Sequence, residues 1–197
     1  MNRIIGIIVS TVIILFSTVS FAFAEELHWG FKKATDGNQI EISSELETML
    51  AKYDAIYRGD PQAKTIYLTF DNGYENGFTE RILDALKEED VPATFFLTGH
   101  YVTSASDLVK RMVKDGHIIG NHSDKHPNMA RLSEAQMLTE WQNFDKKLKE
   151  VTGLERTYYT RPPEGVYNET LLAVGAKNDY RHIFWSIAFK DWEKDVR

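Results

Sequence analysis

Four short clusters of polar residues hold the side chains of this 197-residue chain that could do chemistry. In chain order they are Asp71-Asn72-Gly73, His122-Ser123-Asp124-Lys125-His126, Arg161-Pro162-Pro163-Glu164-Gly165 and Asp191-Trp192. Two imidazoles and an oxygen ligand can bind a divalent metal ion and leave coordination positions open for water. The ion polarises a carbonyl and lowers the pKa of bound water, while a nearby carboxylate takes the proton. Together the clusters therefore indicate metal-assisted hydrolysis.

Each cluster alone also has an ordinary structural explanation. Asp-Asn-Gly is a common turn sequence, and most His-x-x-x-His spacings bind nothing. Pro127 follows His126 directly, which places this pair on a turn rather than inside a helix. Arg161 before two prolines could be a surface arginine, and Asp191-Trp192 could lie in any loop. What favours function is the order of the four clusters and their common position at the ends of predicted strands.

Strand and helix patterns alternate from residue 64 onward. Predicted strands span residues 65–70, 93–99, 117–122, 157–161 and 182–189, and predicted helices span residues 78–90, 107–116, 132–153 and 168–179. This alternation implies a mostly parallel α/β sheet, either a barrel or a doubly wound sheet. In both architectures ligands bind beyond the carboxyl ends of the strands, which is where the polar clusters fall.

The N-terminal region carries an export signal and an arm. Residues 1–24 have a positive start at Arg3, a long apolar run and an Ala22-Phe23-Ala24 cleavage site, which is the layout of a secretory signal peptide. The alternative is an uncleaved or transient membrane anchor, since the apolar run is nearly long enough to span. Residues 25–63 are expected to form an arm, with Trp29 and Phe31 clamped onto the body, and a helix over 45–57.

Composition limits the classes of function. The formal net charge is −6, and there is no basic tract of the kind that nucleic acid requires. The chain has no cysteine, which excludes disulfides, thiolate metal sites and a cysteine nucleophile. The length is that of one domain with a real core. We expect an exported monomer that does not bind nucleic acid.

The ordered clusters resemble the motifs of the polysaccharide deacetylase (NodB-homology) family. That family has Thr-Phe-Asp-Asp-Gly, His-Ser/Thr-x-x-His, Arg-x-Pro-x-Gly and Asp-x-x-Asp-Trp, where this chain has "TFDNG", "HSDKH", "RPPEG" and "AFKDW". The match covers about Lys64 to Trp192. The segments "HWGFKK", "ATFFLTGHY" and "HIIGNHS" resemble the sequences of one branch of the family, the peptidoglycan deacetylases whose product leads to muramic δ-lactam.

The resemblance implies a fold and a role for each matching residue. The fold would be the family's distorted (β/α) barrel, formed by residues 64–197. By this resemblance Asp71 would be the catalytic base, Arg161 would orient Asp71 and tune its charge, and Asp191 would be the partner of a C-terminal histidine. The metal ligands would be Asn72, His122 and His126. Pro163 and Trp192 would contact the substrate. The cofactor would be a divalent ion: zinc, cobalt or manganese. His117 is expected to be packed or capping, and His100 either contacts substrate or is buried.

Three positions depart from the family pattern. Asn72 stands where most members have a metal-binding aspartate, although the muramic branch shares this asparagine, and an amide is a poorer ligand than a carboxylate. Ala188 replaces the first acidic residue of the fourth motif. The fifth motif, Leu-x-His, is missing because the sequence ends at Arg197, so the barrel is expected to be incomplete at its C-terminus and Asp191 to lack its partner.

The implied reaction is hydrolysis of the N-acetyl amide of N-acetylmuramic acid in a peptidoglycan strand, with release of acetate. The expected setting is outside the cytoplasm, in the cell wall or the space of the spore cortex. One alternative is a deacetylase of N-acetylglucosamine or chitin-type oligomers. The other is a non-catalytic glycan-binding remnant, which the missing fifth motif favours.

Overall fold

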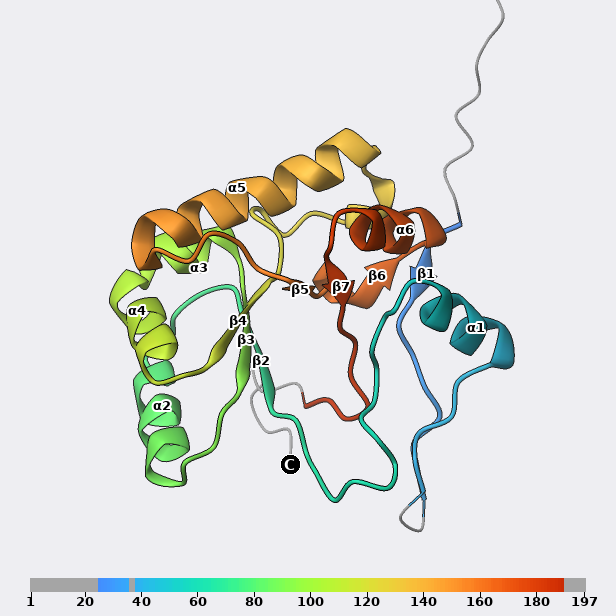
Figure 1. The fold of residues 1–197 in the computed structure, drawn as a ribbon, viewed down its shortest axis with the longest axis horizontal. Coiled ribbons are helices and arrows are strands. Elements are labelled where there is room, and N and C mark those ends of the chain that lie inside the picture. The colour runs from blue at the N-terminus through green and yellow to red at the C-terminus, as the bar shows by residue number, and fades with distance from the viewer. Residues whose placement is uncertain (1–24, 36–37, 190–197) are drawn as a thin grey trace, which may run out of the picture.

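The computed structural model describes residues 25–35 and 38–189 of the chain (Figure 1). The predicted signal peptide, Asp191 and Trp192 therefore lie outside the described residues. None of the helices in the described parts of the chain combines the length and the hydrophobicity needed to cross a bilayer.

The centre of the fold is a five-stranded parallel sheet (Figure 1). Its strands, in spatial order, are β2 (Thr69–Asn72), β3 (Thr94–Leu97), β4 (Ile118–Asn121), β5 (Tyr159–Thr160) and β7 (Arg181–His182). Asn72 pairs with Leu97, which pairs with Asn121, so the carboxyl ends of three strands meet at one edge. The α/β prediction with a parallel sheet is confirmed.

Six α-helices surround this sheet in the described residues. They are α1 (Ser44–Lys52), α2 (Thr79–Glu88), α3 (Gly99–Ser104), α4 (Ser106–Lys114), α5 (Glu134–Thr152) and α6 (Glu169–Lys177), with two 3-10 turns, η1 (Met129–Arg131) and η2 (Pro163–Gly165). Figure 1 shows α2, α3 and α4 along one side of the sheet, with α5 packed against α3 and α4. The long α5 begins with the predicted capping box of Ser133 and Gln136, and it ends at Gly153 in the left-handed conformation.

The helix α5 joins two hydrophobic cores. Its N-terminal half contributes Met137 and Trp141 to a core shared with the N-terminal arm, α1 and α6. Its C-terminal half contributes Phe144 and Leu148 to a core under α2, α3, α4 and β3. All four side chains are at most 1% exposed. Because one continuous helix packs into both cores, α5 is a rigid support for the loops beside it.

Two predicted strands are shorter than expected, the helix predicted over 45–57 ends at Lys52, and some short elements were not predicted. The strand predicted over 65–70 begins only at Thr69, and Ile66 and Tyr67 are 83% and 70% exposed. The pairing register would set Tyr67 opposite Pro92, which has no N–H to donate to a ladder. The strand predicted over 182–189 is reduced to β7. The helix α3 and the short antiparallel pair of β1 (Leu27–His28) and β6 (Val166–Tyr167) were not predicted.

The N-terminal arm is clamped onto the body by Trp29, as predicted. The Trp29 ring stacks on Phe184 with centroids 4.5 Å apart, and its Nε1 donates a hydrogen bond to the carbonyl of Trp185 at 2.9 Å. The Trp29 amide donates to the carbonyl of Gly165 at 2.8 Å. A side chain at Gly165 would lie 2.7 Å from the Trp185 ring, and its φ is +68°, so only glycine fits this position. The arm therefore supports the chain that follows β7.

The buried imidazole of His182 makes the fold sensitive to acid. Both ring nitrogens are buried without a hydrogen-bond partner among the described residues, and burial lowers the pKa to about 3. Below pH ~6.5 the His182 imidazole therefore takes up a proton in the unfolded chain but not in the folded chain. The free energy of unfolding consequently decreases as the pH falls. Between pH 7.5 and 5.0 we expect His182→Leu to lose about 2 kcal/mol less stability than the wild type loses. Urea unfolding at the two pH values measures this difference.

The matched control is His28→Leu, because His28 is an exposed histidine in β1. This variant should lose as much stability as the wild type over the same pH interval. An equal loss in the wild type and in His182→Leu would show that His182 does not set the acid response.

Candidate active site

Asp71 and Asn72 occupy the carboxyl end of β2, and the turn that follows them is tied to β3. The Thr98 amide donates to the carbonyl of Asn72 at 3.1 Å, and the Thr98 hydroxyl donates to the carbonyl of Gly73 at 3.2 Å. Asp71 has 39% of its side chain exposed. The Asp-Asn-Gly sequence thus forms a turn and also places a carboxylate at the edge of the sheet.

Arg161 binds the Asp71 carboxylate from the buried side. Its Nη1 donates to Asp71 Oδ1 at 2.6 Å, and its side chain is only 4% exposed. The other guanidinium donors bind the carbonyls of Ile183 at 3.1 Å and Phe184 at 3.3 Å, and the hydroxyl of Thr69 at 3.0 Å. Every nitrogen of the guanidinium group thus has an acceptor, as a buried charge requires.

Aromatic rings enclose the guanidinium of Arg161. Its Cζ lies 4.1 Å from the ring centroid of Phe96 and 5.5 Å from that of Trp185. A side chain at Gly120 would collide with the Phe96 ring, so this glycine of "HIIGNH" leaves room for the ring. Burial lowers the pKa of Arg161, and the charge of Asp71 opposes that shift. An arginine this well paired stays charged at neutral pH.

His122 presents one ring nitrogen toward Asp71. Its Nδ1 lies 2.9 Å from the carbonyl of Arg161, which can only accept a hydrogen bond, so Nδ1 carries the proton. Its Nε2 keeps a free lone pair and lies 3.9 Å from Asp71 Oδ2. Burial lowers the pKa of His122, although Asp71 acts in the opposite direction. A neutral imidazole with an oriented lone pair is the form that binds metal ions.

His126 stands next to His122 on a strained loop. The two ring centroids are 4.8 Å apart, with the rings edge to face. Ser123 and His126 have φ angles of 66° and 58°, in the left-handed region that residues other than glycine rarely adopt. The Ser123 hydroxyl accepts a hydrogen bond from the His126 amide at 2.9 Å. Strained backbone of this kind concentrates at functional sites.

Asn72, His122 and His126 carry donor atoms of the kinds that bind divalent metal ions. Asn72 Oδ1 is buried and has no hydrogen-bond partner among the described residues, which is costly unless it binds something else. His122 Nε2 has its lone pair free, as described above. Over residues 25–35 and 38–189, no group of three or more His, Asp or Glu side chains has the geometry of a metal site. A metal site among the described residues would therefore need a ligand of another type, and the buried amide oxygen of Asn72 is one candidate.

The other predicted site residues have different outcomes. Pro163 is buried in η2 and offers little surface to a glycan. His117 is packed as expected: it is 8% exposed, its Nδ1 accepts from the Ala93 amide at 3.2 Å, and burial lowers its pKa. His100 is exposed beside the Tyr74 ring, so the alternative of a buried role is wrong, whereas the alternative of a substrate contact stays a prediction. Asp191 and Trp192 lie outside the described residues.

Sequence reasoning missed the groups that hold Arg161. Thr69 and Phe96 lie in predicted strands, and their alternation could have suggested that they point to one side of the sheet. The carbonyls of Ile183 and Phe184 carry no sequence signal, because every residue has a backbone carbonyl.

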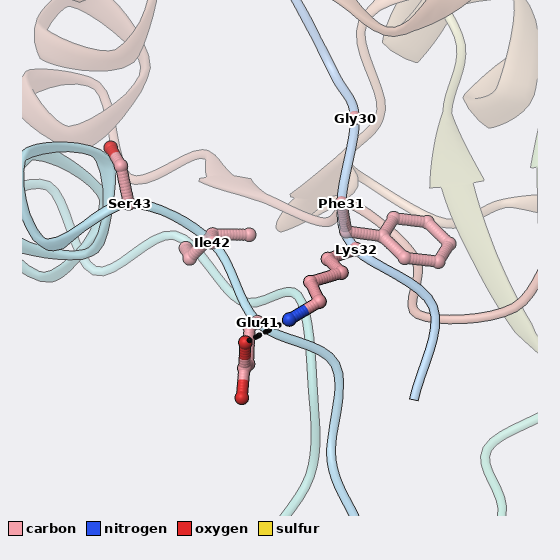
Figure 2. A pocket seen from close by; sticks show the side chains of 6 residues that line it. All are labelled: Gly30, Phe31, Lys32, Glu41, Ile42 and Ser43. Carbon is pink, nitrogen blue, oxygen red and sulfur yellow. Dashed lines mark hydrogen bonds and ion pairs between the residues drawn. The ribbon is translucent and has the colours of Figure 1, made fainter. Parts of the chain in front are cut away.

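A pocket of about 450 Å³ in the N-terminal arm contains none of these groups (Figure 2). It is lined by Gly30, Phe31, Lys32, Glu41, Ile42 and Ser43. Figure 2 shows Lys32 and Glu41 joined across it by an ion pair of 3.3 Å between two exposed side chains. The reactive side chains lie instead at the open edge of the sheet.

Comparison with known proteins identifies the family of the chain. A sequence model of the polysaccharide deacetylase family matches residues 58–183. A 30.6 kDa protein of Geobacillus stearothermophilus is 52% identical over 179 residues, which are 90% of this chain and 68% of that protein. The peptidoglycan-N-acetylmuramic acid deacetylase PdaA of Bacillus subtilis is 43% identical over 169 residues, which are 86% of this chain and 64% of that protein.

Solved structures show the same fold. The structure of B. subtilis PdaA, a family 4 carbohydrate esterase, matches with a TM-score of 0.83 and covers 86% of this chain and 72% of the solved chain. A family 4 carbohydrate esterase from Bacillus anthracis matches with a TM-score of 0.77 at 43% identity, and covers 86% of this chain and 77% of the solved chain. The likeness confirms the predicted α/β fold of the barrel type. The chain belongs to the polysaccharide deacetylase family, a family of hydrolases that act on carbon–nitrogen bonds.

Proposed function

We propose that this chain is a peptidoglycan deacetylase that hydrolyses the N-acetyl amide of N-acetylmuramic acid. The observation that carries the proposal is the Asp71 carboxylate, which a buried arginine holds at 2.6 Å and which faces the lone pair of a neutral, buried His122. In the reaction, the oxygen of water joins the acetyl carbon and the carbon–nitrogen bond breaks. Acetate leaves, and the nitrogen takes up a proton, so the sugar keeps a free amine.

Asp71 is the proposed base. Its Oδ1 is occupied by Arg161 at 2.6 Å, so Oδ2 is the atom left to take a proton from water. The bonds of Arg161 to two backbone carbonyls prevent the guanidinium from following the carboxylate into solvent. Arg161 therefore fixes which oxygen of Asp71 is free and where it points, which is a form of preorganisation.

Three residues would hold the metal ion: His122 through Nε2, His126 through its imidazole and Asn72 through Oδ1. When bound, a divalent ion supplies a Lewis acid that polarises the amide carbonyl and lowers the pKa of water. Asn72 contributes no charge, so the site keeps one negative charge fewer than a site with aspartate in this position. Zinc, cobalt and manganese are the proposed ions, since imidazole nitrogen and amide oxygen suit all three.

The proposed sugar rests on the likeness to PdaA, whose name states that it acts on N-acetylmuramic acid. In a glycan strand from which the peptide has been removed, the freed amine of muramic acid can close on the lactyl carboxyl group, with loss of water, to give the δ-lactam of spore cortex. Peptidoglycan lies outside the cytoplasm, which agrees with the export signal predicted for residues 1–24. We propose that the protein acts in the cell wall or the cortex space.

Acetate release from three glycans tests the substrate. The purified chain would be assayed with zinc on peptide-free peptidoglycan strands, on intact peptidoglycan and on chitin oligomers. We expect the fastest acetate release from the peptide-free strands, with the new amine on muramic acid. Faster release from chitin oligomers, or new amines on N-acetylglucosamine alone, would favour the alternative sugar. Retention on peptidoglycan without any acetate release would favour a glycan-binding protein.

Metal affinity tests the ligand assignment of His122. We expect His122→Ala to weaken zinc binding by more than the roughly 10–100-fold that loss of an outer-shell partner costs. Calorimetric titration of the metal-free protein measures the affinity without any dependence on turnover. His28→Ala is the control, because this exposed histidine lies in β1. Equal zinc affinity in the wild type and His122→Ala would remove His122 from the ligand set.

A further inference from the structure

The loop of residues 122–126 is held from outside by the carboxylate of Glu140 on α5. Glu140 Oε2 accepts hydrogen bonds from two consecutive amides, those of Asp124 at 3.0 Å and Lys125 at 2.8 Å. These amides lie between the two candidate metal ligands, His122 and His126. A carboxylate that binds two adjacent backbone N–H groups makes a charge-assisted pair of bonds and fixes the direction of the chain between them.

The same helix holds the loop at two further points. Lys147 Nζ lies 2.6 Å from Asp124 Oδ1, whose side chain is only 3% exposed. The carbonyl of Trp141 accepts a hydrogen bond from the Asn121 side chain at 3.1 Å, directly before the loop. Glu140, Trp141 and Lys147 lie on one helix that packs into both cores, so the loop is fastened to a rigid element.

The loop needs this external support because its own backbone is strained. Ser123 and His126 both have positive φ angles, and such conformations persist only where surrounding contacts enforce them. Inside the loop, Asn121 Oδ1 accepts from the Ser123 amide, and the Ser123 hydroxyl accepts from the His126 amide. These internal bonds leave the amides of Asp124 and Lys125, and Glu140 is the group that accepts from both.

We propose that Glu140 is a positioning residue, which holds the 122–126 loop in the strained conformation that brings His126 beside His122. It acts through the backbone and touches neither substrate nor metal. The effect that we expect on metal binding rests on the proposed function. The statement about loop conformation stands on the contacts of Glu140 alone.

The test compares three variants of the full chain. Glu140→Ala removes both acceptor bonds. Glu140→Gln keeps a side-chain carbonyl oxygen that can accept from the same two amides, without the negative charge. Glu150→Ala is the matched control, since Glu150 is an exposed glutamate on the same helix. Thermal unfolding of each variant shows whether a loss of global stability accompanies the substitution.

The first measurement is amide hydrogen exchange of the segment 121–127 in metal-free protein, at equal distance below each variant's unfolding temperature. We expect at least about tenfold faster exchange in Glu140→Ala, a smaller rise in Glu140→Gln and no change in Glu150→Ala. The second measurement is zinc affinity by calorimetry. We expect Glu140→Ala to weaken it by roughly 10–100-fold, as for other residues that orient ligands, and Glu140→Gln to restore most of it.

Unchanged exchange in Glu140→Ala overturns the proposal, because the loop then holds its conformation without the carboxylate. Faster exchange with unchanged zinc affinity also overturns it, because the loop conformation then does not position the ligands. If the wild type itself binds no zinc, cobalt or manganese, the proposed function fails. The exchange data then decide the loop assignment by themselves.

Discussion

Asp71→Asn should reduce acetate release by about 10²–10⁴-fold, the usual contribution of a positioned general base. The amide of asparagine cannot take a proton from water, so the reaction loses its base. The variant should nevertheless fold, because the new amide oxygen can still accept the hydrogen bond of Arg161. The guanidinium also keeps the carbonyls of Ile183 and Phe184. Acetate release measured at saturating zinc gives the comparison.

The control is Asp107→Asn, in the first turn of α4, where 97% of the aspartate side chain is exposed. This variant should release acetate at the wild-type rate. Circular dichroism should show the same secondary structure for both variants and the wild type. Full acetate release by Asp71→Asn would mean that the base is another residue.

Arg161→Met should destabilise the fold by about 3 kcal/mol and reduce activity by at least about tenfold. The substitution removes every donor to the carbonyls of Ile183 and Phe184 that the guanidinium supplied, and it frees Asp71 to rotate. Asp71 is partly exposed and can regain water, which keeps the cost near the low end for a broken buried pair. Urea unfolding and acetate release measure the two effects.

Arg161→Lys separates charge from geometry. Lysine keeps the positive charge beside Asp71 but cannot reach several acceptors with one planar fork, so its activity and stability should lie between those of the wild type and Arg161→Met. Arg131→Met is the control, because Arg131 forms a surface ion pair with Glu26 and its loss should change stability far less than Arg161→Met. A stable, fully active Arg161→Met would show that the arginine neither supports nor positions Asp71.

The parallel-sheet rule predicted the meeting of Asp71 and Arg161, which are far apart in the sequence. The pattern of strands and helices placed both residues after strands, and parallel strands end at one edge. The same reasoning brought His122 to this edge. It could not supply the partners of the guanidinium, because these include main-chain carbonyls whose positions depend on the packing of Trp29 and Trp185.

The errors in the predicted elements also have physical causes. The apolar alternation of 65–68 is typical of a strand, but the opposite residue in the next strand would be Pro92, which cannot extend the ladder. The helix α3 begins with Gly99, a weak helix former, and its only start signal is Thr98, whose hydroxyl caps the first turn. The strained loop of Ser123 and His126 has no glycine to reveal it, and the hydrogen bonds that hold it come from α5, from Gly99 and from within the loop.

The measurement that tests the central claim most directly is acetate release from peptide-free peptidoglycan strands before and after removal of metal. The protein would be assayed as purified, after treatment with a chelator, and after addition of zinc, cobalt or manganese. If Asp71, Asn72, His122 and His126 form a metal-assisted hydrolytic site, the chelator should abolish acetate release and at least one of the three ions should restore it. Acetate release that continues unchanged without metal, or that no ion supports, would contradict this account.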